Sequence, residues 1–181
     1  PFIKKEIARL REITFRKVGE GTGKKMDSDK YDNLYKHIVL WDEKNLEIVG
    51  SYRIGIVKDL AKSHENNSLY TNTLFKFKEN FTKYISESLE LGRSFVQQKY
   101  WNSYALDYLW QGVGAFIAAH PEYRYVFGAV SISNIYPQEV KDMLVYFYKK
   151  WFPDREVIAM SINQYEISMK RQRELQLLFS S

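Results

Sequence analysis

Three charged residues lie inside apolar, β-rich segments of the sequence. Glu90 is flanked by Leu89 and Leu91, Arg93 follows shortly after, and Arg53 ends the run Gly50-Ser51-Tyr52-Arg53. Because burying an unpaired carboxylate costs several kcal/mol, Glu90 needs either a partner or a raised pKa. A raised pKa suits a general base, whereas pairing with Arg53, Arg93 and the loop of Asp29 and Asp32 describes a buried ion-pair network without a catalytic role. The residues alone leave both interpretations open.

Glu90 and Arg93 are separated by an odd number of positions. On a regular strand their side chains therefore face opposite sides of the sheet. Gly92 stands between them and permits a β-bulge. A shared role for the two residues thus predicts a bulge within this strand.

The spacing of apolar residues predicts the elements that carry these side chains. Residues 3–17 form an amphipathic helix, which glycines end and an acidic loop follows. We expect a hairpin of strands 37–41 and 46–56, a loop over 58–68, and further strands at 89–96, 125–132 and 156–162. Helices are expected over 103–117, with Asn102-Ser103 as its cap, and over 137–151.

The order of these elements predicts an α/β (α+β) fold with a mixed central sheet flanked by helices. A length of 181 residues with 45% hydrophobic content suits a single domain over 1–181. The chain starts at Pro1-Phe2 without an initiator methionine. A segment excised from a longer chain would start in this way.

Composition excludes several kinds of site and partner. The chain has no cysteine, and His64 and His120 have no partners at ligand spacing, so we expect neither a disulfide nor a metal site. No apolar run is long enough to span a membrane, and no signal-peptide pattern occurs, so we expect a cytoplasmic domain. The net charge of +5, with basic residues crowded into the first segment, is consistent with an acidic partner or with a solvated helix face. No nucleic-acid-binding motif accompanies this charge.

Two patterns imitate known motifs without meeting their requirements. Residues 19–24 suggest a phosphate-binding loop, but Val18 and Lys25 stand where that motif needs Gly and Ser or Thr. His37 and Asp42 have the spacing of glycerolipid acyltransferases, but they lie along a predicted strand. We assign a function to neither pattern.

Several spaced motifs occur in the order seen in one enzyme family. They are Leu10-Arg11 with Phe15, the acidic Asp27-x-Asp29-x-x-Asp32 with His37, Gly50-Ser51-Tyr52-Arg53, Glu90-Leu91-Gly92-Arg93-Ser94-Phe95-Val96, and Leu109-Trp110-x-Gly112. Over residues 5–150 the chain resembles the hemolysin-like acyltransferases of the GNAT fold, which include bacterial ornithine and glycine N-acyltransferases. It is more distantly similar to the acyl-homoserine-lactone synthases.

The resemblance implies a GNAT fold and assigns roles to the matching residues. Those carried over are Arg11, Phe15, Asp29, Asp32, Arg53, Glu90 and Arg93. We expect Glu90 to act as the base, while Arg53 and Arg93 position it or hold the substrate. Strand amides near Phe95 and Val96 would polarise the thioester carbonyl. Ser131, a candidate on the substrate side, and Tyr148 are lesser candidates for protonating the leaving thiol.

The glycine-rich acetyl-CoA loop usual in GNAT enzymes is absent, because Tyr100 and Asn102 stand at the glycine positions counted from Gln97. A helix starting near Ser103 can still receive one phosphate at its N-terminus. The phosphopantetheine arm of acyl carrier protein carries one phosphate, so this donor fits better than CoA. The donor site expected on this basis comprises Phe95, Val96, Gln97, Asn102, Ser103 and Tyr104, with no bound cofactor.

The residues and the resemblance together predict an N-acyltransferase that moves a fatty acyl group from acyl carrier protein, or from CoA, to the amine of a small amino acid. Its product would belong to amino-acid-lipid synthesis. Two alternatives remain: an acyl-homoserine-lactone synthase, which would consume S-adenosylmethionine, and a non-catalytic domain that binds acyl carrier or a membrane surface. The amphipathic stretch 166–179 suits contact with the inner membrane, although a terminal helix packed on the domain is the simpler interpretation.

Overall fold

The computed structural model describes residues 2–62 and 69–180. Five α-helices are described in this part of the chain: α1 (Phe2–Lys17), α2 (Val57–Lys62), α3 (Ala105–Ala119), α4 (Gln138–Trp151) and α5 (Met169–Leu178). The strands are β1 (Lys36–Asp42), β2 (Glu47–Ile56), β3 (Phe75–Phe77), β4 (Ser88–Val96), β5 (Tyr125–Phe127) and β6 (Ala159–Ser161). Short 3-10 helices lie between them: η1 (Lys30–Asn33), η2 (Tyr70–Thr73), η3 (Glu79–Glu87) and η4 (Gln98–Tyr100).

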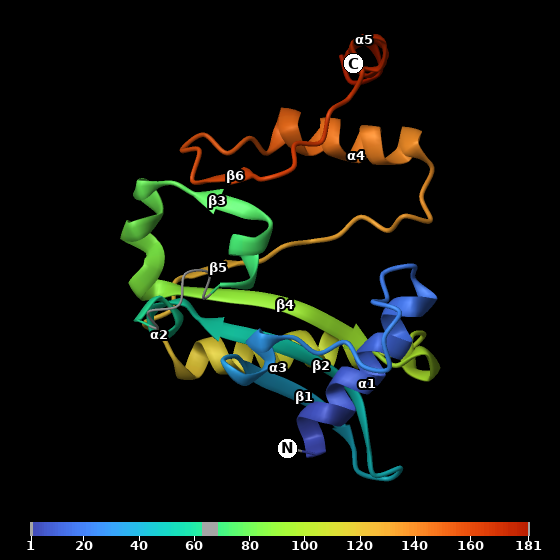
Figure 1. The fold of residues 1–181 in the computed structure, drawn as a ribbon, viewed down its shortest axis with the longest axis vertical. Helices are drawn as coiled ribbons and strands as arrows, with labels where there is room; N and C mark the ends of the chain where they lie inside the picture. The colour runs from blue at the N-terminus through green and yellow to red at the C-terminus, as the bar shows by residue number, and fades with distance from the viewer. Residues whose placement is uncertain (1, 63–68, 181) are drawn as a thin grey trace.

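A four-stranded sheet in the order β1-β2-β4-β5 forms the centre of the molecule (Figure 1). β1, β2 and β4 pair antiparallel, and β5 pairs parallel to β4. The parallel pair requires a crossover, which α3 provides. The predicted mixed α/β architecture with flanking helices is confirmed, and so is the hairpin of β1 and β2.

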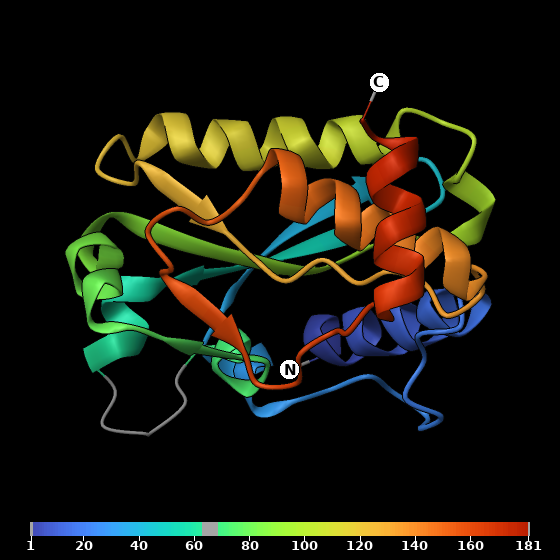
Figure 2. The same cartoon turned by 90° about the horizontal axis from the view of Figure 1, so that it is seen from above.

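Helices cover both faces of this sheet, with α3 on one side and α1 on the other (Figure 2). On the α3 side, Leu89 and Leu91 of β4 form a core cluster with Val113. On the α1 side, Phe95 of the same strand packs with Ile7 of the helix. Burial of these apolar faces is the main force that holds the layers together.

Leu91 and Phe95 should share a face on a regular strand, because they are separated by an even number of positions. A bulge explains why they do not. Ser51 pairs with Phe95, and Arg53 pairs with Gly92. The two partners on β4 are therefore one position further apart than the two residues on β2. Arg93 has a φ of 51°, in the left-handed region. The predicted bulge is present. Its left-handed residue is Arg93 and not Gly92, the glycine that was expected to permit the bulge.

β4 and β5 stay together only from Ser88 to Glu90, which pair with Tyr125 to Phe127. Beyond this point β4 continues beside β2, while residues 128–133 have no regular structure. The prediction of a strand over 125–132 is therefore wrong beyond Phe127. Gly128 marks the separation, because a Cβ there would clash with the carbonyl oxygen of Leu91.

A second layer above the central sheet consists of β3 paired with β6 and of α4 and α5 (Figure 1). The strand expected over 156–162 is shortened to β6, and it pairs with β3, which the sequence pattern did not indicate. The loop expected over 58–68 is also partly wrong, since α2 occupies its start; residues 63–68 lie outside the described residues. α5 packs on α4 and buries Leu175. Among the described helices, none combines the length and apolarity needed to cross a bilayer.

The close approach of β2 to the end of β4 depends on Gly50. A Cβ at this position would clash with the carbonyl oxygen of Phe95. Gly50→Ala should therefore lower the free energy of unfolding by about 1–3 kcal/mol in urea denaturation. Gly114→Ala is the matched control, because no atom lies within 4 Å of its added Cβ and alanine favours a helix. Equal stability of the two variants would contradict this role for Gly50.

Candidate active site

A buried ion-pair network joins α1, the acidic loop, β2 and β4. Arg11 of α1, 1% exposed, donates from Nε to Asp27 at 2.9 Å and from its terminal nitrogens to Asp32 at 2.9 and 3.1 Å. Arg53 of β2 donates to Asp29 at 2.8 Å and to Asp32 at 3.2 Å. The predicted pairing of arginines with the Asp29 and Asp32 loop is confirmed.

Arg93 joins the same network from β4. Its guanidinium lies 3.3 Å from the Asp27 carboxylate and 3.8 Å from that of Asp29. The ring of Tyr70 lies below it at 4.9 Å, and that of Phe15 at 6.0 Å. Its side chain is 21% exposed, more than those of Arg11 and Arg53. The bulge in β4 therefore turns Arg93 toward the acidic loop and leaves part of it open to solvent.

The acidic loop is preorganised for these contacts. Asp29 caps η1 by accepting the amides of Tyr31 and Asp32, and Asp32 accepts the Asp29 amide in return. Burial acts to raise the pKa of Asp32, but the hydrogen bonds and charge of Arg11, the Asp29 amide and the charge of Arg53 together hold this pKa below its ordinary value. The Asp32 carboxylate is thus charged at neutral pH and balances the arginines.

Glu90 is buried beside this network but is not paired directly with an arginine in it. One carboxylate oxygen accepts the hydroxyl of Tyr35, and the other accepts the amide of Thr71 at 2.8 Å. Only 2% of Glu90 is exposed, and burial raises its pKa above the ordinary value. One of the two interpretations of the sequence is an ion-pair network in which Glu90 pairs directly with an arginine. The contacts show instead a carboxyl group held by neutral donors.

A cleft of about 930 Å³ opens where β4 and β5 separate. Residues 91–96 of β4 form one wall, and residues 128–131, which follow β5, form the other. The end of α1 adds Phe15, while Trp101 and Trp110 line the side near α3. Among the predicted site residues, this cleft brings together Phe15, Arg93, Phe95, Val96 and Ser131.

The Val96 amide faces the open side of β4. Just after this strand, Gln97 donates its amide to the Val49 carbonyl of β2 at 2.9 Å. Neighbouring residues of a strand direct their amides to opposite edges, so the Val96 amide points away from β2. The Val96 carbonyl on that side accepts the Trp101 indole N–H at 2.7 Å. By the same alternation the Phe95 amide faces β2. Of Phe95, Val96 and Gln97, Val96 alone therefore presents its amide to the cleft.

The segment before α3 differs in detail from the expected cap. α3 begins at Ala105 with Tyr104 as N-cap, and no side chain caps the first turn from that position. The Ser103 hydroxyl accepts the Ala105 amide at 3.2 Å from one residue further out. Asn102 and Tyr104 are exposed. Asn102-Ser103 is therefore not the cap itself, because the chain makes a further turn before the helix starts.

The two candidates for protonating a leaving thiol lie in different places. Ser131 borders the cleft and donates to Glu20 at 2.8 Å. Tyr148 is exposed on α4, contacts Phe147 and Phe152, and does not line the cleft.

The residues of the two patterns that imitate known motifs contact other groups of the protein itself. The loop at Thr22 and Gly23 directs its amides to the carboxylate of Glu12, so a side chain of the protein occupies the anion position. His37 contacts the Asp32 carbonyl at 3.3 Å, while Asp42 accepts amides within the hairpin turn. His120 pairs with Glu122, and His64 lies outside the described residues. No cluster of three or more potential metal ligands occurs in the described ranges.

Sequence reasoning missed four contributors. Asp27 belongs to the acidic motif but is not among the predicted site residues, although it binds both Arg11 and Arg93. Tyr35 and Thr71 hold Glu90, and Tyr70 stacks below the guanidinium of Arg93. The spacing of Asp27 to the other aspartates could have identified it. The other three have no local pattern, since their roles arise from contacts distant in sequence.

The buried network predicts a sharp difference between two arginines of α1. Arg11→Ala removes a fully buried cation from two buried carboxylates and should cost about 3–5 kcal/mol of unfolding free energy. Arg9→Ala removes an exposed pair with Glu6 on the same helix and should cost at most about 1 kcal/mol. Arg93→Ala should fall between them, because Arg93 is partly exposed. Thermal or urea unfolding measures all three, and similar losses for Arg11→Ala and Arg9→Ala would contradict the stabilising role of the buried network.

The chain is similar in sequence to known proteins. A family model described as an acetyltransferase (GNAT) domain matches residues 10–111. Glycine N(alpha)-acyltransferase of Phocaeicola vulgatus is 39% identical over 179 residues, covering 92% of this chain and 55% of that protein. The enzyme of the same name from Bacteroides thetaiotaomicron is 39% identical over 171 residues, covering 88% and 51%.

L-ornithine N(alpha)-acyltransferase of Rhizobium meliloti is more distant, at 26% identity over 136 residues, which cover 72% of this chain and 45% of that protein. The chain thus spans about half the length of the curated relatives it matches. No solved structure gives a significant match. The family match covers more than half of the chain and includes the bulged β4, the acidic loop and the start of α3. This chain belongs to the GNAT acetyltransferase domain family.

Proposed function

We propose that this chain is an N-acyltransferase domain that transfers a fatty acyl group from a carrier thioester to the α-amine of an amino acid. The observation that carries the proposal is the cleft between the separated strands, into which the Val96 amide points. Extended thioester arms can lie between two such strands, because their open edges offer unpaired backbone groups. An acyl transferase needs such a donor at the carbonyl oxygen, where negative charge develops.

The amine nitrogen attacks the thioester carbonyl carbon and forms a tetrahedral intermediate, whose oxyanion the Val96 amide stabilises. The C–S bond then breaks, the amide product forms, and the carrier leaves as a thiol after taking a proton. The amine loses its proton to Glu90. Because Glu90 is buried and does not line the cleft, this proton travels through a water or a neighbouring polar group.

The acceptor is an amino acid in this proposal. The relatives are named for glycine and ornithine, two amino acids that share an α-amine and an α-carboxylate. Arg93 is the arginine of the network that lines the cleft, and it is assigned to the acceptor carboxylate. Arg11, Arg53, Asp29 and Asp32 then act by holding the acidic loop and Arg93 in place, while Phe15 and Ser131 border the acceptor.

The acyl donor is acyl carrier protein rather than CoA. The glycine-rich loop that would hold a pyrophosphate is absent before α3. The first turn of this helix offers backbone amides, which suit one phosphate. We assign Gln97, Asn102, Ser103 and Tyr104 to this donor site. α1 adds exposed basic residues near the cleft, where its C-terminal part contributes Phe15. The N-acyl amino acid produced would be a lipid precursor, and the exposed apolar residues of α5 suit a membrane surface.

Glu90→Gln should reduce transfer by roughly 100- to 10,000-fold while preserving the fold, because it removes the base and keeps its shape. Steady-state kinetics with an acyl thioester and an amino acid measure this loss. Glu87→Gln is the control, since it makes the same change just before β4 on a side chain that is partly exposed. Near-normal turnover in a folded Glu90→Gln variant would eliminate the proposed base.

The pH dependence gives a second readout of Glu90. A base acts only when deprotonated, and burial raises the pKa of Glu90, so kcat/KM should rise with pH through this raised pKa. The amine contributes its own rise at higher pH in every variant. Residual activity of Glu90→Gln should lack the lower rise and retain the higher one. Identical profiles for the parent and Glu90→Gln would place the base elsewhere.

The donor proposal predicts a local effect of charge. Lys17 is exposed near the part of α1 that borders the cleft, whereas Lys5 lies about 18 Å away along the helix axis. Lys17→Glu should raise the Michaelis constant for acyl carrier protein more than Lys5→Glu does, and neither should change reaction with a short pantetheine thioester. The difference should shrink as salt rises, because exposed charges are screened over about 8 Å at physiological ionic strength. Equal effects of both substitutions on both donors would reject docking at this surface.

A further inference from the structure

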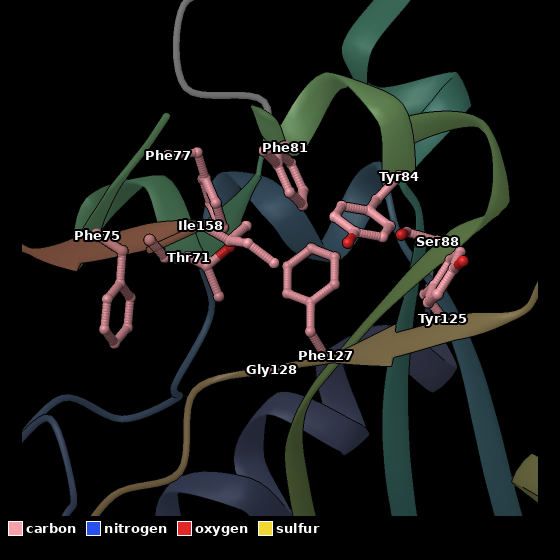
Figure 3. A pocket seen from close by; sticks show the side chains of 11 residues that line it. Thr71, Phe75, Phe77, Phe81, Tyr84, Ser88, Tyr125, Phe127, Gly128 and Ile158 are labelled. Carbon is pink, nitrogen blue, oxygen red and sulfur yellow. The ribbon is translucent and has the colours of Figure 1, made fainter. Parts of the chain in front are cut away.

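An apolar cavity of about 420 Å³ lies between the central sheet and the layer of β3 and β6. Phe75 and Phe77 line it from β3, Phe81 and Tyr84 from η3, and Ile158 from the residue before β6 (Figure 3). Phe127 of β5 projects into its middle, where it lies 5.5 Å from Phe81, ring centre to ring centre. The volume falls within the range of about 300–1,000 Å³ that is common for ligand pockets.

The chemistry of the walls selects the occupant. The described residues that line the cavity include no charged side chain. A zwitterionic amino acid would lose its hydration there without gaining partners, which is strongly unfavourable. A hydrocarbon chain gains free energy by leaving water for such a surface. The cavity therefore suits an alkyl tail and not the amino-acid acceptor.

The cavity adjoins the cleft. Phe127 and Gly128 line both spaces. Tyr70 and Leu74 line the cleft, and their sequence neighbours Thr71 and Phe75 line the cavity. The junction is also where the last paired residues of the parallel strands, Glu90 and Phe127, lie. A thioester positioned in the cleft can therefore extend its tail into the cavity.

The opposite end of the cavity carries two tyrosines. Tyr84 of η3 and Tyr125 of β5 meet edge to face, with ring centres 4.8 Å apart. Figure 3 shows them on the side of Phe127 that is away from Phe75, next to Ser88. An extended tail that enters from the cleft would reach this pair last.

We propose that this cavity binds the hydrocarbon tail of the acyl donor and that the Tyr84–Tyr125 pair sets the longest tail it accommodates. The inference rests on the proposed acyl transfer, because it identifies the ligand through the cleft. It adds a binding site for the tail and two residues that determine specificity. Tyr84 and Tyr125 touch the end of the tail and not the reacting atoms.

The test measures binding instead of transfer. A homologous series of alkyl-pantetheine thioethers, which cannot transfer an acyl group, is titrated against the chain by isothermal calorimetry. Affinity should rise about fourfold for each added methylene group and then level off when the tail reaches the two tyrosines. Tyr125→Ala should move this limit to longer tails. Tyr108→Ala removes an exposed tyrosine of α3 that does not line the cavity, so it should leave the limit unchanged.

A second variant fills the cavity. Ala159→Phe adds a ring to a lining residue of β6 and should move the limit to shorter tails. Circular dichroism confirms that each variant is folded. Affinity independent of tail length in the parent, or the same limit in the parent, Tyr125→Ala and Ala159→Phe, would overturn the proposal.

The same series distinguishes this inference from the proposed function. Transfer from a short acetyl thioester, which does not reach the cavity, is measured separately. Length-dependent binding with these shifts supports the tail site whether or not transfer occurs. Absence of transfer from every thioester would reject the acyltransferase function alone. Transfer together with length-independent binding would overturn the tail site and leave the proposed function standing.

Discussion

The buried pairing of Arg11 with Asp27 and Asp32 is the constraint on which the rest of the site depends. These charges cannot be buried singly, so α1 and the acidic loop must dock together, and Arg53 of β2 adds a second cation to the same carboxylates. The network therefore joins three segments distant in sequence at one face of the sheet. Arg93 completes it from β4 and connects it to the cleft.

The bulge in β4 allows one strand to serve both faces. Before it, Leu91 packs toward α3; after it, Phe95 packs toward α1, and Arg93 turns to the acidic loop. β5 leaves β4 just before the bulge, so the other edge of β4 is open from there to Val96. The ion pairs compensate the left-handed conformation of Arg93, which a residue with a side chain adopts only at a cost.

The charged residues and the apolar cavity lie on different sides of the point where β4 and β5 separate. The charged network and Arg93 lie on the α1 side of the cleft, while the aromatic cavity continues toward β3 and β6. Glu90 lies at the junction, held by Tyr35 and by the amide of Thr71, whose side chain lines the apolar cavity. This arrangement places a buried carboxyl group between the cleft to which we assign the amino acid and the cavity proposed for the hydrocarbon tail.

The sequence by itself determined the order of the longer helices and of the central strands, the antiparallel hairpin, the mixed sheet and the buried charges at Arg53 and Glu90, because apolar periodicity and the cost of burial act locally. It also indicated a bulge between Glu90 and Arg93. It did not indicate α2 or β3. Only the tertiary structure decided that Glu90 binds Tyr35 and Thr71, that Asp27 joins the network, and that β5 ends at Phe127. These outcomes depend on contacts between segments far apart in the chain, and no local spacing records which partner a buried group meets.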